Sequence, residues 1–500
     1  MIKLIKNLFC AVLMLSLVFS AFSSCASATP EKGEKGENDP ADNPEEQTES
    51  TTEGKLPFEP TVIDLGGRDF TFCDCGWGAE VNSEQRDVLA AEQNGETIND
   101  AVYARNMVIM DMFNCVIAEQ KYPGPGEMLS PLQKSIKSGD GQFDAAYLRF
   151  ASHLNSLATG NLLFDLEKMT NMDLAQPWWD QNCVSMTSIA GKLFAVTGDI
   201  EILDKGAINA FVFNKQLQSD YQIEDFYGLV KTGKWTLGKM LEISKQISSD
   251  LNGDGKMDEN DRYGLFYYRD SLPAFLSGAG EYIARKDEND LPYMSFNNEK
   301  VYNALESIYE VIYDENVAFH TMRAFGDAGF IIEGNKMFQN NQGLIRYIRM
   351  MEIEGLRSME TDFGILPFPK YDEIQKDYLS LVNSIICPGL AIPATADQDI
   401  SGAVLEAMAY ESRYTLLPAY YDVMLKTKVS RDSDSEEMLT IIFGNTTYDL
   451  GGIYAFGGID SELMYHTMDL KRTMASFYEK NESKAQKDID KLVNSIFDLD

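Results

Sequence analysis

The residues whose types and spacing most clearly suggest chemistry lie in one acidic loop, residues 250–261. The pattern fits a calcium-binding loop, in which side-chain oxygens and one main-chain carbonyl surround the ion. Asp261 stands where a longer Glu usually supplies two oxygens, so we expect a weak, structural Ca²⁺ site. The alternative is a metal-free acidic turn between a helix and a strand. The expected ligands are Asp250, Asn252, Asp254, the carbonyl of Lys256, Asp258 and Asp261.

Residues with catalytic spacing are absent from the sequence. The chain has three His residues, which lie far apart and outside any H-E-x-x-H pattern. No G-x-S-x-G motif occurs. Among 78 Asp and Glu residues, no pair can be singled out as the two carboxylates of a glycosidase. We therefore expect a protein that is not an enzyme and has no organic cofactor.

A second group of residues is suited to holding a sugar. Trp77 follows a predicted strand between two glycines, and Trp178 and Trp179 precede a predicted joint between domains. Aromatic rings stack on the C–H faces of sugars, while Arg149 and Asp199, also at strand ends, would bond the hydroxyls. Open α/β sheets bind ligands at the carboxyl ends of their strands. The alternative for each side chain is packing in the core or between domains.

Alternating strands and helices are expected to position these residues. The apolar residues Ala101, Ala104, Val108 and Met112 share one face of the first expected helix. The alternation favours an α/β fold with mostly parallel sheets. The expected strands are 69–75, 116–118, 143–147, 192–197, 207–213, 263–268, 362–366, 379–386 and 390–393, and the expected helices are 99–112, one from Ser130 and Pro131 to Gly139, 154–163, one capped by Thr236, 300–313, 400–410, 435–443 and 485–496.

The stretch Gly191–Lys215 is predicted to join two domains. Two extended segments flank a polar joint that Gly198 and Gly206 punctuate, and a second joint is predicted around Cys387–Gly389. A chain of 500 residues is too long for one core, so two domains are expected. Two crossings make a hinge, and hinged domains can close on a ligand. The expected boundaries are 58–203 with 388–412 for lobe I and 204–387 with 413–500 for lobe II.

The N-terminus predicts export. Two Lys residues precede the apolar stretch Leu8–Phe19, as in a secretory signal, and the stretch is too short for a stable spanning helix. Small residues before Cys25 resemble a bacterial lipobox, which implies a signal peptide over 1–24 and a lipid on Cys25. Ordinary cleavage with free secretion is the alternative. Residues 25–57 are polar and acidic, and they predict a disordered tether.

The charge of the chain excludes one class of partner. The net charge is −35, and phosphate binding needs clustered Lys and Arg. Nucleic acid and anionic lipid surfaces are therefore not expected partners. The folded part would lie at the extracellular face of the cell membrane, attached through its lipid anchor only.

Several stretches carry a family resemblance over nearly the whole chain after the tether. They are Asn99–Asn106, Gly139–Asp144, Gly191–Asp199, Phe213–Lys215, Lys234–Gly264, Asp362–Pro367 and Ser430–Leu439. In these stretches the chain resembles the extracellular solute-binding proteins of bacterial ABC importers, the carbohydrate-binding family that includes maltose-binding protein. The resemblance implies a periplasmic-binding-protein-like type II fold, with two α/β lobes joined by hinge crossings around a ligand cleft. It also implies a monomeric, non-catalytic binder that delivers an oligosaccharide to an ABC permease.

Carried over by position, the resemblance places six side chains in the cleft. In lobe I it points Trp77, Leu148 and Arg149 into the cleft, and the crossing offers Asp199. In lobe II, Arg346 and Tyr347 lie where the stretch resembles the family's ligand-facing strand end. Arg149 and Arg346 together would also suit an acidic sugar or another anion.

Two other functions stay open from the sequence. One is a glycan-capturing or sensing lipoprotein of the same fold that serves no importer. The other is a secreted glycoside hydrolase, which would need a catalytic carboxylate pair facing the cleft.

Overall fold

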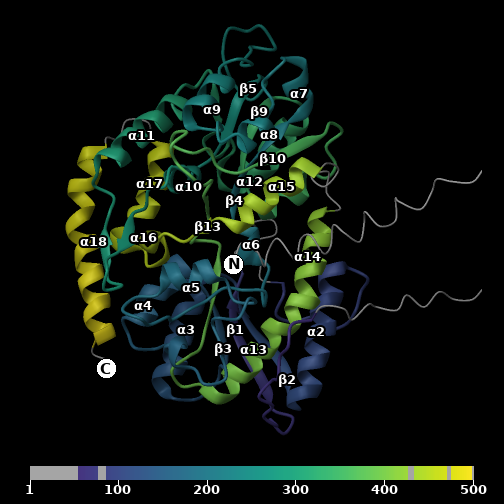
Figure 1. The fold of residues 1–500 in the computed structure, drawn as a ribbon, viewed down its shortest axis with the longest axis vertical. Helices are drawn as coiled ribbons and strands as arrows, with labels where there is room; N and C mark the ends of the chain where they lie inside the picture. Colours follow the sequence, from purple (N-terminus) through teal and green to yellow (C-terminus); the bar gives the residue numbers. More distant parts are fainter. Residues whose placement is uncertain (1–54, 77–85, 426–432, 470–473, 498–500) are drawn as a thin grey trace, which may run out of the picture. The chain divides into compact units, whose positions relative to one another are not determined.

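Two mixed sheets, of four and five strands, organise the described part of the chain (Figure 1). The computed structural model describes residues 55–76, 86–425, 433–469 and 474–497. Residues 59–500 cluster into one unit, apart from residues 1–58. The predicted signal peptide, Cys25 and nearly all of the predicted tether lie outside the described residues.

Sheet I, the four-stranded sheet, has the strand order β12-β3-β1-β2. Strand β1 is parallel to β2 and β3, and β12 runs antiparallel to β3. Because side chains alternate along a strand, Phe70 and Phe72 of β1 are buried on one face and Cys73 and Cys75 on the other. Both faces are therefore covered, as in other α/β sheets. The bounds are β1 Asp69–Cys75, β2 Val116–Tyr122, β3 Ala145–Arg149 and β12 Pro388–Ala391.

Sheet II, the five-stranded sheet, has the strand order β10-β4-β9-β5-β8. Strand β5 is parallel to β8 and β9, whereas β4 is antiparallel to β9 and β10. Two of the four strand pairs in sheet II are antiparallel, so the expectation of mostly parallel sheets is wrong for β4 and its two neighbours. The reason is that the chain reaches β4 at the edge where β5 and β9 end, so β4 runs in the opposite direction. The bounds are β4 Asn209–Asn214, β5 Tyr263–Tyr267, β8 Ala318–His320, β9 Gly343–Arg349 and β10 Phe363–Leu366.

Helices and short strands fill the connections between the strands of the two sheets (Figure 1). The longer helices are α2 Thr97–Phe113, α3 Pro125–Ser138, α11 Glu299–Ile312, α12 Thr321–Gln339, α13 Gln398–Tyr414, α14 Leu416–Leu425, α15 Ser433–Gly444, α17 Ile459–Met468 and α18 Met474–Phe497. The shorter elements are η2 Phe150–Leu154, α4 Asn155–Ala158, η3 Leu166–Lys168, α5 Gln181–Thr187, α6 Leu203–Gly206, α7 Lys215–Asp220, α8 Phe226–Lys231, α9 Leu237–Ser244, α10 Ser271–Gly278, β6 Ala284–Lys286, β7 Pro292–Met294, η4 Met350–Leu356, β11 Ser380–Leu381, β13 Thr446–Thr447, α16 Leu450–Ile453 and η6 Phe456–Gly458.

Local signals predict the ends of some helices and miss others. Thr236 caps α9, because its hydroxyl accepts a hydrogen bond from the Lys239 amide over 3.3 Å. Gly139 ends α3 in the left-handed conformation, at φ 68°. The predicted start of α3 at Ser130 is wrong, since the helix begins at Pro125 and contains Pro131. Proline at the first helical position is favourable, and Pro125 is the proline that takes this role.

The buried face of α2 also differs from the predicted one. Ile98, Val102 and Ile109 are buried against the protein, while Val108 is 41% exposed. Both sets recur at helical spacing, so periodicity alone does not choose between them.

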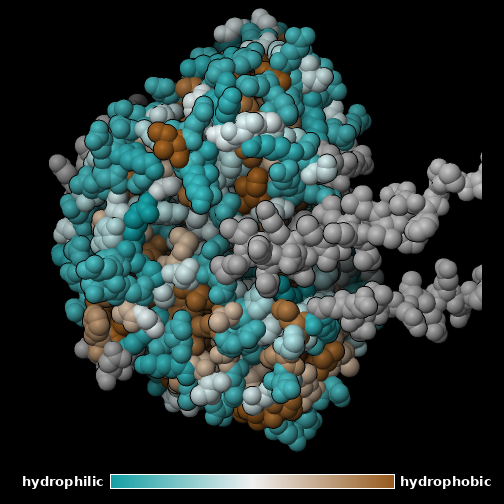
Figure 2. Space-filling model, in the orientation of Figure 1, coloured by the Kyte–Doolittle hydropathy of each residue, from teal (hydrophilic) through white to brown (hydrophobic). Residues whose placement is uncertain are grey.

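The face in view in Figure 2 is mostly hydrophilic, and the described cysteines lie in the core. Figure 2 shows hydrophilic residues over most of the face in view, in keeping with the net charge of −35. Among the described residues, Cys73, Cys75, Cys115, Cys183 and Cys387 are buried as free thiols. In the same part of the chain, every helix is too short or too polar to cross a membrane.

Candidate functional site

Two segments that run between the sheets lie against each other. The first crossing, residues 198–208, leads into β4, and the second crossing, residues 382–388, leads into β12. Ile208 of the first crossing and Val382 of the second form an antiparallel bridge. The predicted strands 192–197 and 379–386 are only partly realised, because much of their hydrogen bonding goes to such isolated bridges.

The crossings also contact the carboxyl ends of both sheets. Directly after β9, the Met350 amide donates to the Ile208 carbonyl over 2.9 Å. Directly after β3, the Ala151 amide donates to the Ser384 carbonyl over 3.1 Å. Open α/β sheets bind ligands at the carboxyl ends of their strands, so this meeting place is the candidate binding site.

A third segment passes between the sheets at residues 446–449. Helix α15 before it contacts β10 of sheet II, and α16 after it contacts α5 and η2 beside sheet I. The Thr447 carbonyl accepts from the Val382 amide over 2.9 Å, and the Tyr448 hydroxyl donates to Asp180 over 3.0 Å. The sequence predicts at least two crossings and locates two joints. The glycines at 451, 452, 457 and 458 are the signal that points to a third.

Gly198 is needed for a close approach of backbone segments. A Cβ at this position would lie 2.4 Å from the Trp178 carbonyl oxygen. The neighbouring Asp199 amide donates to that same oxygen over 2.7 Å. Any larger residue at 198 would therefore displace the start of the first crossing.

Asp199, predicted to meet a ligand, is held by basic neighbours. Its Oδ2 accepts from Arg413 over 2.5 Å, and the Lys205 ammonium lies 3.9 Å from its Oδ1. Burial raises the pKa of Asp199, and the charges of Lys205 and Arg413 oppose the rise. The carboxylate ties the first crossing to the end of α13, and its contact with a solute stays a prediction.

Lys205 fixes the backbone of the first crossing. Its Nζ donates to the Gly198 carbonyl over 2.7 Å and to the Asp204 carboxylate over 2.8 Å. Burial raises the pKa of Asp204 to about 7, and Lys205 opposes the rise. Burial by itself lowers the pKa of Lys205, but Asp204 and Asp199 outweigh it and raise that pKa. The ammonium therefore keeps its charge and its hold on the crossing.

Arg149 lies at the end of β3 and is fully buried. Its Nη2 donates to the Cys75 carbonyl over 2.8 Å, which ties the ends of β3 and β1 together. Asp74 is buried nearby, neither of its oxygens makes a hydrogen bond, and the Lys121 ammonium lies 3.6 Å away. Burial raises the pKa of Asp74 to about 8; Arg149 and Lys121 oppose the rise, and Glu119 adds to it.

Arg346 belongs to a buried charge network at the carboxyl end of β9, the central strand of sheet II. Its Nη2 lies 3.4 Å from the Glu352 carboxylate, which also accepts from Arg349 over 2.9 Å and from the Tyr268 hydroxyl. Burial lowers the pKa of Arg346, and Glu352 opposes the fall. Tyr347 is buried as well, and its hydroxyl donates to Asn209 of β4 over 2.7 Å. The organising residue, Glu352, is not among the predicted site residues.

Trp178 and Trp179 are buried, and one carboxylate binds both indoles. Their N–H groups donate to the two oxygens of Glu406 in α13 over 2.9 and 2.8 Å. Burial raises the pKa of Glu406 to about 7, and these hydrogen bonds oppose the rise. In this conformation the rings pack inside the protein, which is the alternative stated for them above. Trp77 lies outside the described residues.

The acidic loop folds around its own backbone. Asp250 accepts from the amides of Gly253 and Gly255 over 2.7 and 2.8 Å, and these bonds lower the pKa of Asp250. Asp261 is buried and accepts from the amides of Leu251 and Asp258, each over 2.9 Å. Within the described residues, no three His, Cys, Asp or Glu side chains converge as a metal site would require. Calcium stays a prediction.

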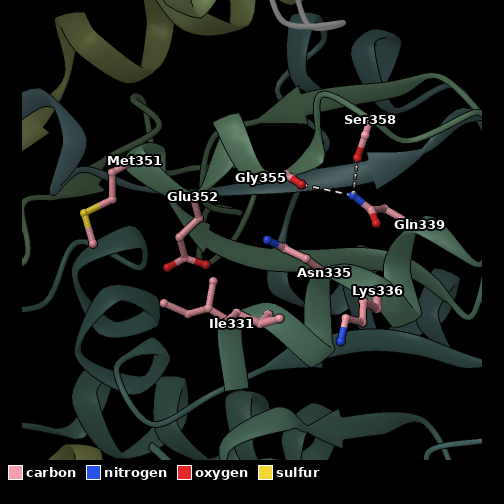
Figure 3. Close-up of a pocket in the computed structure, with 9 residues that line it drawn as sticks. Ile331, Asn335, Lys336, Gln339, Met351, Glu352, Gly355 and Ser358 are labelled. Carbon is pink, nitrogen blue, oxygen red and sulfur yellow. Dashed lines mark hydrogen bonds between the residues drawn. The ribbon is translucent and has the colours of Figure 1, made fainter. Parts of the chain in front are cut away.

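A cavity of 260 Å³ opens between α12 and η4, next to the end of β9 (Figure 3). It borders the first crossing, since a Cβ on Gly206 would lie 3.2 Å from the Met351 Cβ. The sequence analysis does not single out its walls, because they meet only when α12 packs on η4. The lining residues are Ile331, Ile332, Asn335, Lys336, Gln339, Met351, Glu352, Gly355 and Ser358.

Solved structures with this arrangement come from solute-binding proteins. The chain is similar to the ABC substrate-binding protein Lmo0181 from Listeria monocytogenes in complex with cycloalternan, with 12% identity, a TM-score of 0.53, and coverage of 86% of this chain and 99% of that one. It is similar to UspC of M. tuberculosis, with 13% identity, a TM-score of 0.55, and coverage of 84% and 100%. It is also similar to a solute-binding protein from Thermotoga lettingae bound with α-D-tagatose, with 12% identity, a TM-score of 0.53, and coverage of 85% and 100%.

These likenesses are structural. No family model matches the sequence, and a search of curated proteins finds no match. At 12 to 13% identity, the likeness shows the fold alone. The chain has the type II periplasmic-binding-protein-like fold of ABC-transporter solute-binding proteins.

Proposed function

We propose that the protein binds an extracellular, hydroxyl-rich solute, most simply an oligosaccharide, where the two sheets meet, and delivers it to the permease of an ABC importer. The observation that carries the proposal is that the first crossing bonds to the carboxyl end of sheet II, the second crossing bonds to the carboxyl end of sheet I, and the two crossings bridge each other. A solute bound there would contact both sheets at once, and closing the hinge would enclose it.

The charges at the meeting place favour an uncharged solute. Lys205 is paired with Asp204, Arg413 with Asp199, and the Arg346–Arg349 pair with Glu352. An anionic ligand at Lys205, Arg413 or Arg349 would have to displace one of these carboxylates, whereas the Arg346 Nε and Nη1 have no hydrogen-bond partner. The pairs favour a neutral solute, and an acidic sugar bound by Arg346 stays the alternative.

The solutes named in similar structures have the same character. These structures hold cycloalternan, maltotetraose, α-D-tagatose and ribitol, which are uncharged and rich in hydroxyl groups. Hydroxyl groups can hydrogen-bond to ion-paired side chains without disturbing their charge balance. Simple binding of this kind needs no catalytic residue, so we propose that the protein is not an enzyme.

A thermal-shift screen tests the proposal. The mature protein would be melted with neutral oligosaccharides in one set and with peptides in another. A sugar at 100 times its dissociation constant should add about 2.7 kcal/mol to the free energy of unfolding. Stabilisation by peptides and not by sugars would reject the carbohydrate assignment. Release of an unmodified sugar confirms binding, and release of a cleaved product would point to the hydrolase.

The anchoring of the protein forms part of the proposal. We propose that a lipid on Cys25 holds the mature chain, as a monomer, at the extracellular face of the membrane beside its permease. Cys25→Ala should move the protein from the membrane fraction to the medium, with sugar binding unchanged. Retention of the variant in the membrane would reject the lipid anchor. A permease-deletion strain that still takes up the sugar would favour the capturing or sensing role.

A further inference from the structure

The cavity between α12 and η4 is complete without any part of sheet I or the crossings. All nine of its lining residues fall between positions 331 and 358 (Figure 3). The proposed solute site needs both sheets, whereas this cavity keeps its walls whether or not a hinge closes. It therefore raises a binding question of its own.

One polar side chain in the cavity is left unsatisfied by the protein. Asn335 is 9% exposed, and its Oδ1 has no hydrogen-bond partner. In Figure 3 its amide nitrogen points toward the carboxylate of Glu352, which is already bonded to Arg349 and Tyr268. A buried amide without full hydrogen bonding is destabilising, and a ligand with hydroxyl groups would supply the missing bond.

Glycine at position 355 leaves the space that the Asn335 amide occupies. A Cβ on Gly355 would lie 2.6 Å from the Asn335 Nδ2. Gly334, one residue before Asn335, makes the matching space for Arg346, whose Nη1 would lie 2.6 Å from a Cβ there. Gly355 thus leaves room for the Asn335 amide in the cavity lining, and Gly334 leaves room for the Arg346 guanidinium, which is not part of that lining.

The rest of the lining combines neutral polar groups with an apolar wall. The Gln339 Nε2 donates to the Gly355 carbonyl over 3.0 Å and to the Ser358 hydroxyl over 3.3 Å, which fixes both side chains at the rim (Figure 3). Ser358 still has its own O–H to donate. The Lys336 ammonium is paired with Glu333 over 2.7 Å, so it adds no uncompensated charge.

We propose that this cavity is a second binding site, for one neutral sugar or polyol ring. Ile331, Ile332 and Met351 would contact its C–H groups, while Asn335 and Ser358 bond its hydroxyls. The volume of 260 Å³ lies below the roughly 300–1,000 Å³ of sites for larger ligands, which limits the occupant to a single ring. The site binds without hinge closure, because sheet I takes no part in it.

Calorimetric titration of the purified mature protein with D-glucose, D-xylose and myo-inositol tests the site. Asn335→Leu should weaken binding of the tightest of the three at least tenfold and leave oligosaccharide binding unchanged. Asn303→Leu is the control, because Asn303 is an exposed asparagine on α11. Ser358→Trp, at an exposed rim position, should block the site even if Asn335→Leu proves unstable.

Three outcomes overturn the second site. One is wild-type affinity for the ring compounds in both Asn335→Leu and Ser358→Trp. The second is loss of ring compounds and oligosaccharides together, which places both in one site. The third is the absence of any heat with the three ring compounds, whatever the oligosaccharides do. If the proposed function is wrong, the wild-type protein does not bind oligosaccharides, and this result differs from all three.

Discussion

The carboxyl ends of the strands in both sheets lie against the crossings, but the two sheets differ in the buried charges that they carry there. At the edge of sheet II, Glu352 accepts hydrogen bonds from Arg349 and Tyr268 and pairs with Arg346. At the edge of sheet I, Asp74 is buried just as deeply and makes no hydrogen bond. Equal burial therefore produces a fixed charge network on one side and a proton-holding carboxyl group on the other.

The difference follows from what each carboxylate can reach. Glu352 follows β9 by three residues, on the short helix η4, so it can turn back toward the arginines of that strand. Asp74 lies within β1, where it accepts no hydrogen bond from its basic neighbours, Arg149 and Lys121; the Lys121 ammonium lies 3.6 Å away on the neighbouring strand β2. A buried carboxylate without hydrogen bonds favours its neutral form. We expect sheet II to carry the rigid wall of the solute site and sheet I the wall that responds to pH.

Glu352→Ala should give the largest effect. It removes the carboxylate that pairs with two buried arginines, and breaking a buried pair in this way costs about 3–5 kcal/mol. The measurement is the free energy of unfolding from urea titration. Glu333→Ala is the control, because its pair with Lys336 is exposed and should be worth at most about 1 kcal/mol. Equal small losses in both variants would show that the sheet II network is no more important than a surface pair.

The pH dependence of stability should separate the two edges next. The pKa of Asp74 is raised to about 8 in the folded protein, against about 3.9 for an unfolded Asp. Between these values the folded state holds the extra proton, so this group's contribution to stability falls as pH rises and is lost through pH 8. The slope from this one group is at most about 1.4 kcal/mol per pH unit.

Asp74→Asn should flatten that slope while costing little at pH 6, because Asn resembles the neutral acid. Unfolding free energies of wild type and variant at pH 5, 6, 7 and 8 measure the difference. A variant with the wild-type slope, or one that loses several kcal/mol at pH 6, would show that Asp74 is an ionised partner of Lys121. Both sheets would then carry an ionised carboxylate that is paired with a basic side chain.

Adding Ca²⁺ should give the smallest change in stability, and the change should be confined to sheet II. The loop 250–261 leads directly into β5, so an ion held there stabilises sheet II. An ion at three times its dissociation constant adds about 0.8 kcal/mol. Hydrogen exchange with and without Ca²⁺, compared between wild type and Asp250→Asn, measures it. Protection in β5 that Asp250→Asn abolishes supports the site, and equal exchange in all four samples rejects it.

The order of strands and helices could be predicted because each depends on local signals. Thr236 and Gly139 mark helix ends through bonds to residues three or four positions away, and Gly198 marks the first crossing. The buried face of α2 could not be predicted, since it depends on where sheet I and α14 lie. Periodicity gives the existence of a helix and leaves its partner unspecified.

The site was harder to predict than the fold because its side chains pair across long stretches of sequence. Glu406 binds Trp178 and Trp179 from more than 220 positions away, and Arg413 binds Asp199 from 214. Among the described residues chosen from the sequence, Arg149, Arg346 and Tyr347 lie at strand ends and Asp199 lies on the first crossing, but their polar groups bond to other parts of the protein. Their sequence neighbours give no sign of those partners.

Hydrogen–deuterium exchange of the mature protein tests the central claim most directly. Exchange would be compared with and without a mixture of malto-, cello- and xylo-oligosaccharides. We expect protection at the carboxyl ends of both sheets and at both crossings together, at residues 149–154, 198–208, 346–352 and 382–388, with α11 unchanged. Protection confined to one sheet, or none at any of these segments, would contradict the claim that the solute is held where the two sheets meet.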